Sequence, residues 1–476
     1  MYLYIKRIII IWAAAATVYA CAPSMTVRES KMELPGTFNE TLADSLNVAS
    51  MPWKDFYTEP ELQILIEQAL ANNQELNIML QQVAMAQNEI QARKGEYLPF
   101  VTVNAGAEVE KVGKNTRNGA VEENLPIAEG KPFPDPLTNY STRLSATWEL
   151  DVWKKLRNAK KAAVLEYLAT QEGRNFMITN LVSEIADAYY ELLALDARLS
   201  IIDENLSIQN DALRIVRLQK EAARATELAV QRFEAEVFKN RSERFKVKQE
   251  ITVTQNRINF LLGRQPEAVA RGAQPFLDRV IDSMATGLPS QLLRNRADVR
   301  QAEQELASAK INVMVARANF YPSFALRANV GLEAFNPQYL TRTPESLLYG
   351  LMGDMVAPLI NRNAIKATYN NANARQLQAV FEYEKTVLNG YIEVVNELSN
   401  IQNLNESYSL KASQVNALTK SIEISNRLFQ SARADYMEVL LTQRDALESK
   451  IELVETRKEQ YHARNSLFRA LGGGWQ

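Results

Sequence analysis

The chain has 476 residues, 46% of them hydrophobic, and its 54 basic residues nearly balance 56 acidic ones. This balance gives no basic surface of the kind that binds nucleic acid. One cysteine, Cys21, and one histidine, His462, exclude a zinc site of Cys and His ligands, a Cys–His nucleophile pair and a disulfide framework within one chain. We expect no cofactor, no bound metal and no catalytic residue.

Residues 1–20 have the pattern of a signal peptide. Two basic residues precede an apolar stretch at 8–18, which is too short to cross a bilayer as a helix. The sequence Val-Tyr-Ala-Cys at 18–21 then resembles a bacterial lipobox, in which the Cys becomes the lipidated first residue. We therefore expect Cys21 to be a lipid anchor that carries palmitate. The alternative is an ordinary signal peptide followed by a chance cysteine.

Residues 21–60 contain four prolines and no clear period, which predicts an extended N-terminal tether lying on the rest of the molecule. Pro60 then opens a helix, because proline is tolerated in a first turn. This helix is predicted to run over residues 61–97, and Pro99 ends it.

The sequence contains an internal repeat. A shift of 223 residues aligns 68–99 with 291–322 and places Asn72 on Asn295. A shift of 209 residues places Leu262-Gly263 on Leu471-Gly472. Such matches in register order indicate a duplicated chain.

Each copy is predicted to contain a short helix, a pair of strands and a long helical hairpin. Repeat 1 covers 61–263, with strands at about 98–110 and 140–152 and a tip near 223–226; a linker covers 264–288. Repeat 2 covers 289–472, with a helix at 289–319, strands at about 322–334 and 347–359 and a tip near 432–435; residues 473–476 form the C-terminal end.

Long heptad stripes predict the hairpins. Apolar residues recur every seven positions from Ile178 to Leu213, with one parallel stripe broken only by Gln209. The second copy repeats this period from Val380 to Phe429. A helix of about 60 residues would be roughly 90 Å long. A coiled coil or a helical bundle gives the same stripes.

The predicted strands alternate polar and apolar residues over ten or more positions. This pattern is typical of a membrane β-barrel, although half-buried strands of soluble sheets share it. Four strands do not close a pore of useful width, whereas three copies of the chain would supply twelve.

Four motifs carry a family resemblance. They are Leu-Pro-Ser with Arg-Ala-Asp-Val within 288–303, Tyr-Pro at 321–322, Trp-Glu-Leu-Asp-Val-Trp at 148–153 and Leu-Gly-Gly-Gly-Trp at 471–475. With them, the chain resembles the TolC-like outer-membrane efflux proteins, and in particular the lipoprotein branch that serves resistance-nodulation-division (RND) pumps.

The resemblance implies a mainly α fold with a β-barrel part, built from a duplicated strand pair and long helical hairpin. It implies a homotrimer whose twelve strands form an outer-membrane β-barrel, continued by a periplasmic α-barrel of twelve helices. The expected partners are a periplasmic adaptor protein, an inner-membrane RND-type pump and outer-membrane lipid. The expected function is a passive duct that exports small molecules. A periplasm-spanning coiled-coil lipoprotein without transport is the alternative.

In this family the periplasmic tips close the channel and meet the adaptor. The resemblance therefore marks as tip candidates Arg224, Thr226, Arg433, Asp435 and Glu438. Thr226 and Asp435 also suit helix N-caps. Asp435 and Glu438 lie one turn apart at a helix start, where carboxylates favour the helix dipole. In a trimer, these carboxylates would form an acidic ring that favours cations.

Overall fold

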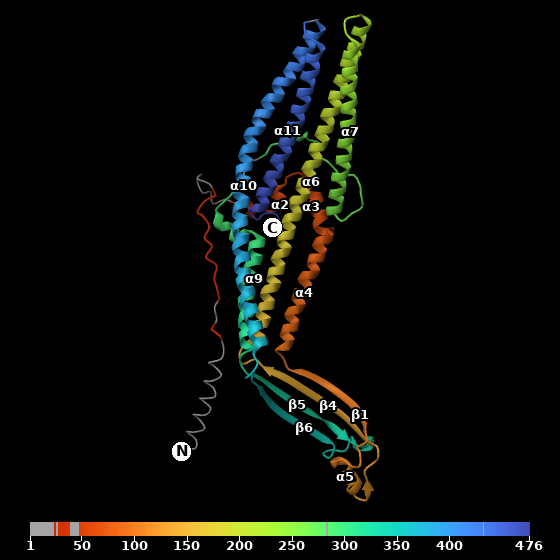
Figure 1. Ribbon diagram of the computed structural model, residues 1–476, viewed down its shortest axis with the longest axis vertical. Coiled ribbons are helices and arrows are strands. Elements are labelled where there is room, and N and C mark those ends of the chain that lie inside the picture. Colours follow the sequence, from red (N-terminus) through yellow and green to blue (C-terminus); the bar gives the residue numbers. More distant parts are fainter. Residues whose placement is uncertain (1–22, 25–26, 39–46, 282–283, 432) are drawn as a thin grey trace. The chain divides into compact units, whose positions relative to one another are not determined.

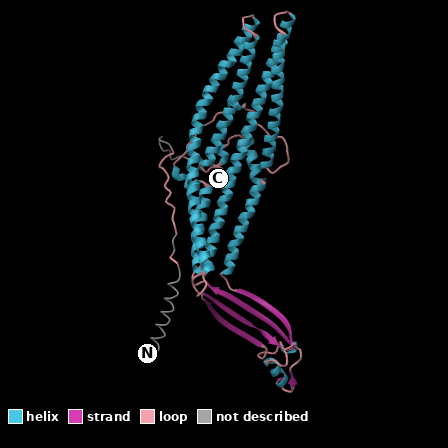
Figure 2. Ribbon diagram, in the orientation of Figure 1, coloured by secondary structure: helices cyan, strands magenta, loops and turns pink. Residues whose placement is uncertain are grey.

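The computed structural model describes residues 23–24, 27–38, 47–281, 284–431 and 433–476. The predicted signal peptide, the lipid-anchor candidate Cys21 and Ala432 lie outside these residues. The described chain is mainly helical with one four-stranded sheet (Figures 1 and 2). None of its described helices combines the length and the apolar character needed to cross a membrane.

The chain divides into two compact units, and each unit combines segments from both predicted repeats. The sheet unit contains Ala84–Leu168, Gln304–Phe381 and the described residues of Met1–Glu29. The hairpin unit contains Ser30–Val83, Ala169–Glu303 and Glu382–Gln476. The long helices contribute residues to both units. The boundary between the two units therefore does not coincide with the boundary between the two repeats.

The sheet unit holds the four long strands in the order β1-β4-β5-β6, with every neighbouring pair antiparallel (Figure 1). The strands are β1 (Phe100–Glu110), β4 (Leu137–Leu150), β5 (Ser323–Ala334) and β6 (Leu347–Val356). The connections contain α5 (Arg117–Asn124), β2 (Pro126–Ala128), β3 (Lys131–Pro132) and the 3₁₀ turn η4 (Pro337–Tyr339). Within the described chain, β1 and β6 each keep one edge without a partner strand.

The register gives this sheet one polar and one apolar face. Arg143 of β4 lies opposite Asn104 of β1 and Gly331 of β5. One residue further along β4, Leu144 lies opposite hydrophobic Val103 and Val330. Because side chains alternate between the faces of a strand, this offset of one residue separates the two kinds of side chain over most of β1, β4 and β5. On β6 the separation is incomplete, because Met352 lies opposite Arg327 on the polar face.

Two helical hairpins follow the two strand pairs (Figure 1). The first consists of α6 (Lys155–Glu221) and α7 (Glu227–Leu261), and the second of α10 (Asn363–Gln430) and α11 (Tyr436–Ala470). The heptad stripe of α6 is buried at Ile185, Leu192 and Leu213, as its period predicts. Gln209, which interrupts the second stripe, is also buried, and its Oε1 accepts a 2.9 Å hydrogen bond from Asn240 of α7.

The prediction of one continuous helix at 61–97 is wrong, because Asn73 separates α3 (Pro60–Asn72) from α4 (Gln74–Glu96). The helix predicted at 289–319 is also interrupted, at Arg296. It consists of η3 (Pro289–Gln291), α8 (Leu292–Asn295) and α9 (Ala297–Ala318). Asn73 and Arg296 correspond under the 223-residue shift, so both copies have the same break.

The largest core cluster lies in the hairpin unit. It packs aromatic residues of α6 and α11 against the short elements before α3, and Phe56 stacks on Phe468 with a centroid distance of 3.9 Å. These elements are η1 (Val48–Ser50) and α2 (Trp53–Phe56), and the linker adds η2 (Phe276–Asp278). The part of the tether from Val48 to Phe56 is therefore helical in places, where an extended segment was expected.

Candidate functional site

The polar face of the sheet carries paired charges. Arg143 Nη2 lies 2.8 Å from Glu333 Oε2, and Asn139 donates to the other oxygen of Glu333 at 2.7 Å. Arg327 pairs with Asp354 at 3.1 Å. Each of these charged side chains stays 29–61% exposed, so water reaches them and the pairs add little stability. This face is suited to lining an aqueous passage.

Side chains of the apolar face are exposed to a greater degree. Tyr349, Leu351 and Met355 of β6 are 82%, 79% and 65% exposed, and Val103 of β1 is 74% exposed. A contiguous apolar surface of this kind is a site of contact with a membrane or a partner. A sheet with one hydrated face and one uncovered apolar face fits the wall of a membrane channel.

The first hairpin end lies in the hairpin unit between α6 and α7. Ala223 has a left-handed backbone with φ of 58°, and Arg224 N–H donates to Gln219 C=O at 2.8 Å, the pattern of a Schellman helix end. Thr226 then caps α7, because its hydroxyl accepts a 3.2 Å hydrogen bond from Ala229 N–H. These contacts fix a tight turn without glycine.

An ion pair spans the same turn. Lys220, in the last turn of α6, pairs with Glu227, in the first turn of α7. The hydrogen bond from Lys220 holds the pKa of the Glu227 carboxyl below its usual value. Both side chains are exposed, so this pair fastens the turn only weakly.

The second hairpin end repeats the first in part. Arg433 N–H donates to Leu428 C=O at 2.9 Å, as Arg224 does to Gln219. Asp435 holds the N-cap position of α11, but its carboxylate makes no capping hydrogen bond. Glu438 lies in the first turn of α11. Asp435 therefore occupies the predicted N-cap position but makes no capping hydrogen bond.

The structure places all five predicted tip residues on exposed surface. The two hairpin ends share one core cluster, in which Ala225 of the first end and Phe429 and Tyr436 of the second pack around the buried residues of α6 and α7. Among the described residues, the side chains of Arg433 and Asp435 have no ion pair, so the second end presents its charges to solvent.

The breaks at Asn73 and Arg296 form a pair of equivalent joints that sequence reasoning missed. Asn73 Nδ2 donates to the Leu261 carbonyl at the end of α7, at 2.9 Å. Arg296 Nη1 donates to the Ala470 carbonyl at the end of α11, at 2.8 Å. Leu261 and Ala470 correspond under the 209-residue shift, so each joint fastens a short helix to the last turn of its own return helix.

Glycine is required at both joints. Gly263 has φ of 67°, and a Cβ there would lie 2.5 Å from the Asn72 carbonyl oxygen. Gly472 has φ of 94°, and a Cβ there would lie 2.7 Å from the Asn295 carbonyl oxygen. The 209-residue shift aligns Gly263 with Gly472, and the 223-residue shift aligns Asn72 with Asn295. The internal repeat was therefore the sequence signal that marked the two joints.

The second joint is charged. Arg296, only 5% exposed, makes a two-pronged ion pair with Asp298, with a shortest distance of 2.6 Å, and contacts Glu393 of α10 at 2.7 Å. Burial acts to lower the pKa of Arg296, but the hydrogen bonds and charges of both carboxylates raise it above its usual value. A Cβ at Gly390 would lie 3.0 Å from the guanidinium, so glycine leaves the space that Arg296 occupies.

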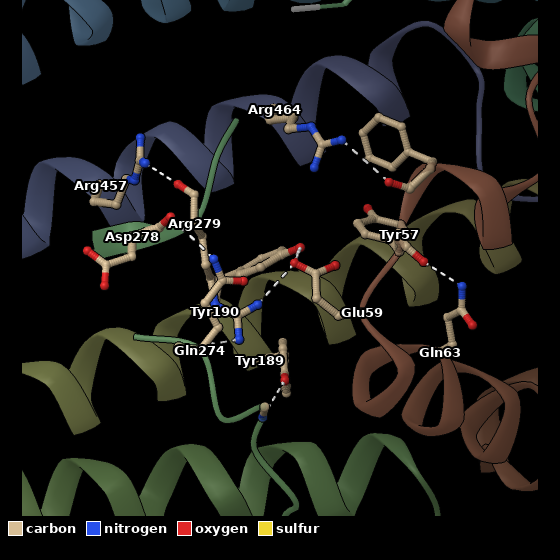
Figure 3. Close-up of polar contacts among 12 residues, drawn as sticks. Tyr57, Glu59, Gln63, Tyr189, Tyr190, Gln274, Asp278, Arg279, Arg457 and Arg464 are labelled. Carbon is tan, nitrogen blue, oxygen red and sulfur yellow. Dashed lines mark hydrogen bonds and ion pairs between the residues drawn. The ribbon is translucent and has the colours of Figure 1, made fainter. Parts of the chain in front are cut away.

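A further buried polar cluster ties the linker to the N-terminal segment (Figure 3). Arg279, also 5% exposed, pairs with Glu59 at 3.2 Å, and Tyr190 O–H donates to the same carboxylate at 3.0 Å. Arg457 of α11 donates to the Arg279 carbonyl. Desolvation by burial raises the pKa of the Tyr190 hydroxyl well above its usual value, so the residue remains a neutral donor.

A duplicated chain with two long hairpins and a two-faced, open-edged sheet has the architecture of an outer-membrane channel subunit. A model of the family described as outer membrane efflux protein matches residues 65–264 and 288–473. The chain therefore belongs to the outer membrane efflux protein family. The resemblance to TolC-like proteins, the outer-membrane location and the role in efflux are thereby confirmed.

Relatives of known name match almost the whole chain. It is 26% identical to the pyoverdine export outer membrane protein OpmQ of Pseudomonas aeruginosa, over 96% of this chain and 94% of the relative. It is 25% identical to the cation efflux system protein CusC of Escherichia coli K12, over 97% and 98%. The open-state structure of the Neisseria gonorrhoeae MtrE outer membrane channel has the same fold, with a TM-score of 0.84, 21% identity and coverage of 96% and 99%.

Proposed function

We propose that three copies of this chain form a passive duct, the outer-membrane component of a tripartite efflux system. The duct exports small molecules from the periplasm, or from an inner-membrane pump, to the exterior. The observation that carries this proposal is the sheet, with its polar face, its apolar face and its two unpaired edges. The alternative of a non-transporting coiled-coil lipoprotein accounts for the hairpins and leaves this sheet without a purpose.

The unpaired edges support closure between copies. Successive strands in the order β1-β4-β5-β6 alternate in direction, so β6 of one copy meets β1 of the next as an antiparallel neighbour. Three sheets joined in this way close a twelve-stranded β-barrel and leave no free edge. The polar faces then line the lumen, and the apolar faces contact lipid.

The hairpins support the same assembly. Exposed aromatic side chains form a stripe along α7 at Phe238, Phe245 and Phe260, which are 63–70% exposed in one copy. On α10, Leu410 and Ile424 are 71% and 58% exposed and lie two heptads apart. Such stripes require covering, and a neighbouring copy of the chain would cover them. Twelve long helices from three copies then form the wall of the periplasmic α-barrel.

The hairpin ends are the proposed docking and closing surface. Arg224 and Arg433 are exposed and occupy equivalent positions, and Asp435 and Glu438 supply negative charge beside the second. In a trimer these side chains form rings that meet a periplasmic adaptor and select ions at the closed end. The energy for transport comes from an RND-type inner-membrane pump. The lipid on Cys21 anchors the chain to the outer membrane.

Single-channel conductance of the purified protein in a planar bilayer tests this function. The wild-type duct is expected to conduct weakly, because its hairpin ends are closed. Arg433→Ala is expected to loosen that end and raise the conductance. Arg444→Ala, which removes an exposed charge of α11 that pairs with the neighbouring Asp445, is the matched control and should conduct like the wild type. Absence of any channel current in all three proteins would refute the duct.

The lipid anchor has a separate test. Cells that express the wild-type chain in the presence of radiolabelled palmitate should label it, and Cys21→Ser should abolish the label. Labelling of Cys21→Ser would exclude the lipid anchor and leave the ordinary signal peptide. Conductance of the unlabelled variant then shows whether the duct needs its anchor.

A further inference from the structure

A cavity of about 310 Å³ opens in the hairpin unit between the linker, α10 and α11. Its described lining residues are Ile281, Met284, Leu398, Ile401, Asn405, Gln460, Arg464 and Leu467. This volume lies at the lower end of the range of small-molecule sites. Its lining residues include none of the polar face of the sheet and none of the hairpin ends.

The walls and the floor of this cavity differ in character. The linker contributes Met284, α10 contributes Ile401, and α11 contributes Leu467, which gives apolar walls from three separate segments. The floor is polar, because Gln460 Nε2 donates to Asn405 Oδ1 at 2.8 Å. Apolar walls with a few converging polar groups are typical of a ligand site.

Among the described lining residues, Arg464 alone is charged. Its guanidinium stacks 4.3 Å from the Phe56 ring and donates to the Phe56 carbonyl at 3.4 Å, a long hydrogen bond (Figure 3). No carboxylate of the described chain lies within ion-pair distance of it. Arg279 and Arg296 of the same unit each pair with a carboxylate, whereas the half-buried Arg464 has no counter-ion among the residues that the structure describes.

We propose that this cavity binds a small amphipathic anion, a carboxylate carried by an unbranched alkyl chain. The carboxylate pairs with Arg464, whose fork of donors matches its two oxygens, and Gln460 contributes a further polar contact. The alkyl chain packs against Ile401, Met284 and their neighbours, where its transfer from water is favourable. The bound ligand bridges the linker, α10 and α11 and so stabilises the folded hairpin unit.

Titration calorimetry with octanoate on the full-length protein in nanodiscs of zwitterionic lipid tests this inference. Heat from empty nanodiscs is subtracted, because octanoate also partitions into lipid. The neutral isostere octanamide is the matched ligand. Because the charge-assisted pair with Arg464 is lost, octanamide should bind at least about tenfold more weakly.

Two variants locate the binding. Arg464→Gln should reduce octanoate affinity to that of octanamide, whereas Arg444→Gln on the same helix should leave it unchanged. Because Arg464 also contacts Phe56, its replacement could change the local fold, so a second variant is needed. Ile401→Trp fills the cavity and keeps the charge of Arg464, and it should abolish binding of both ligands. Absence of octanoate binding, equal affinity for both ligands, or unchanged binding by Ile401→Trp would each overturn the inference.

Discussion

At the scale of single residues, the hairpin ends show that a helix end tolerates a strained backbone where space is free. Ala223 adopts φ of 58° on exposed surface, although a residue with a Cβ pays roughly 1–2 kcal/mol for that conformation. Gly263 and Gly472 have similar positive φ angles but face backbone carbonyls. Of these three positions, only the two at the joints require glycine, because a Cβ there would also collide with a neighbouring helix.

The caps of the two return helices should differ in strength. Thr226→Ala removes a capping hydrogen bond and is expected to lower the free energy of unfolding by about 1 kcal/mol. Asp435→Ala removes a side chain that makes no such bond and should cost less than half as much. Urea unfolding of both variants, followed by circular dichroism, checks the order. Equal losses would show that the capping hydrogen bond of Thr226 does not govern stability.

His462 should make stability depend on pH. Its Nδ1 lies 3.1 Å from Asp187 Oδ2, and this hydrogen bond raises the pKa of His462 although partial burial acts against it. The protonated form is favoured in the folded state, so its stabilisation is complete below the unfolded pKa of about 6.5 and disappears as pH rises through the folded pKa. Exposure screens the pair and keeps the effect below about 1 kcal/mol.

Thermal unfolding between about pH 5.5 and pH 8.5 measures this contribution. The wild type should lose stability across that interval relative to His462→Gln, which keeps a hydrogen-bond donor and has no charge change. Because His462 is the only histidine in the chain, no other imidazole contributes. Parallel profiles for the two proteins would assign the pH dependence to other groups.

At the scale of secondary-structure elements, α6 and α7 are joined by a buried amide pair and a ladder of surface charges. Arg198 of α6 contacts Glu243 and Glu250, and Arg244 of α7 contacts Asp203 at 2.5 Å. These ion pairs favour the pairing of α6 with α7 in one register, and each adds little to the stability of the protein. The pair between Gln209 and Asn240 is buried, so its energetics depend on whether both members are present.

A double-mutant cycle tests the buried pair. Gln209→Leu alone leaves the Asn240 amide buried without an acceptor and is expected to destabilise the protein by about 1–3 kcal/mol. Gln209→Leu combined with Asn240→Leu replaces both amides by apolar groups and should recover most of that loss. Unfolding free energies of the single and double variants provide the coupling energy. Additive losses would show that the two amides act independently.

The elements were predictable to different degrees. The heptad period identified the buried stripe of α6, and strict alternation identified the faces of the strands. The break at Asn73 was not predictable, because neither glycine nor proline occurs there and the interruption arises from a hydrogen bond to a carbonyl distant in sequence. The end of β4 was placed two residues late, because Asp151 turns the chain and accepts from the Leu156 and Arg157 amides.

At the scale of the whole molecule, the two faces of the sheet should tolerate charge differently. Val103 and Thr102 are neighbours on β1 and point to the apolar and the polar face. Val103→Arg places a charge against lipid and is expected to cost up to about 2–4 kcal/mol, whereas Thr102→Arg faces water and should cost about 1 kcal/mol or less. Unfolding of both variants in lipid vesicles provides the comparison, and equal costs would contradict the assignment of the faces.

The proposed ligand cavity and the joints were beyond the reach of sequence patterns for the same reason. Arg464 lies on a helix with ordinary heptads, and the absence of a carboxylate partner for it among the described residues depends on the packing of three distant segments. The family motif around Arg296 was visible, yet the sequence did not show that its guanidinium contacts the end of α11. Spatial neighbours, rather than residue types, define both sites.

The two joints have a consequence for symmetry. One is fastened by a neutral amide at Asn73, the other by the ionised trio of Arg296, Asp298 and Glu393. Added salt screens the carboxylate of Glu393, which is 38% exposed, more than the buried contacts of either joint, and leaves the amide contact almost unchanged. In the proposed trimer, the first hairpin (α6 and α7) and the second hairpin (α10 and α11) of each copy alternate around the wall. Rising ionic strength should therefore loosen the second hairpin of every copy first. The tube would then deform with threefold symmetry, although its duplicated architecture approaches sixfold.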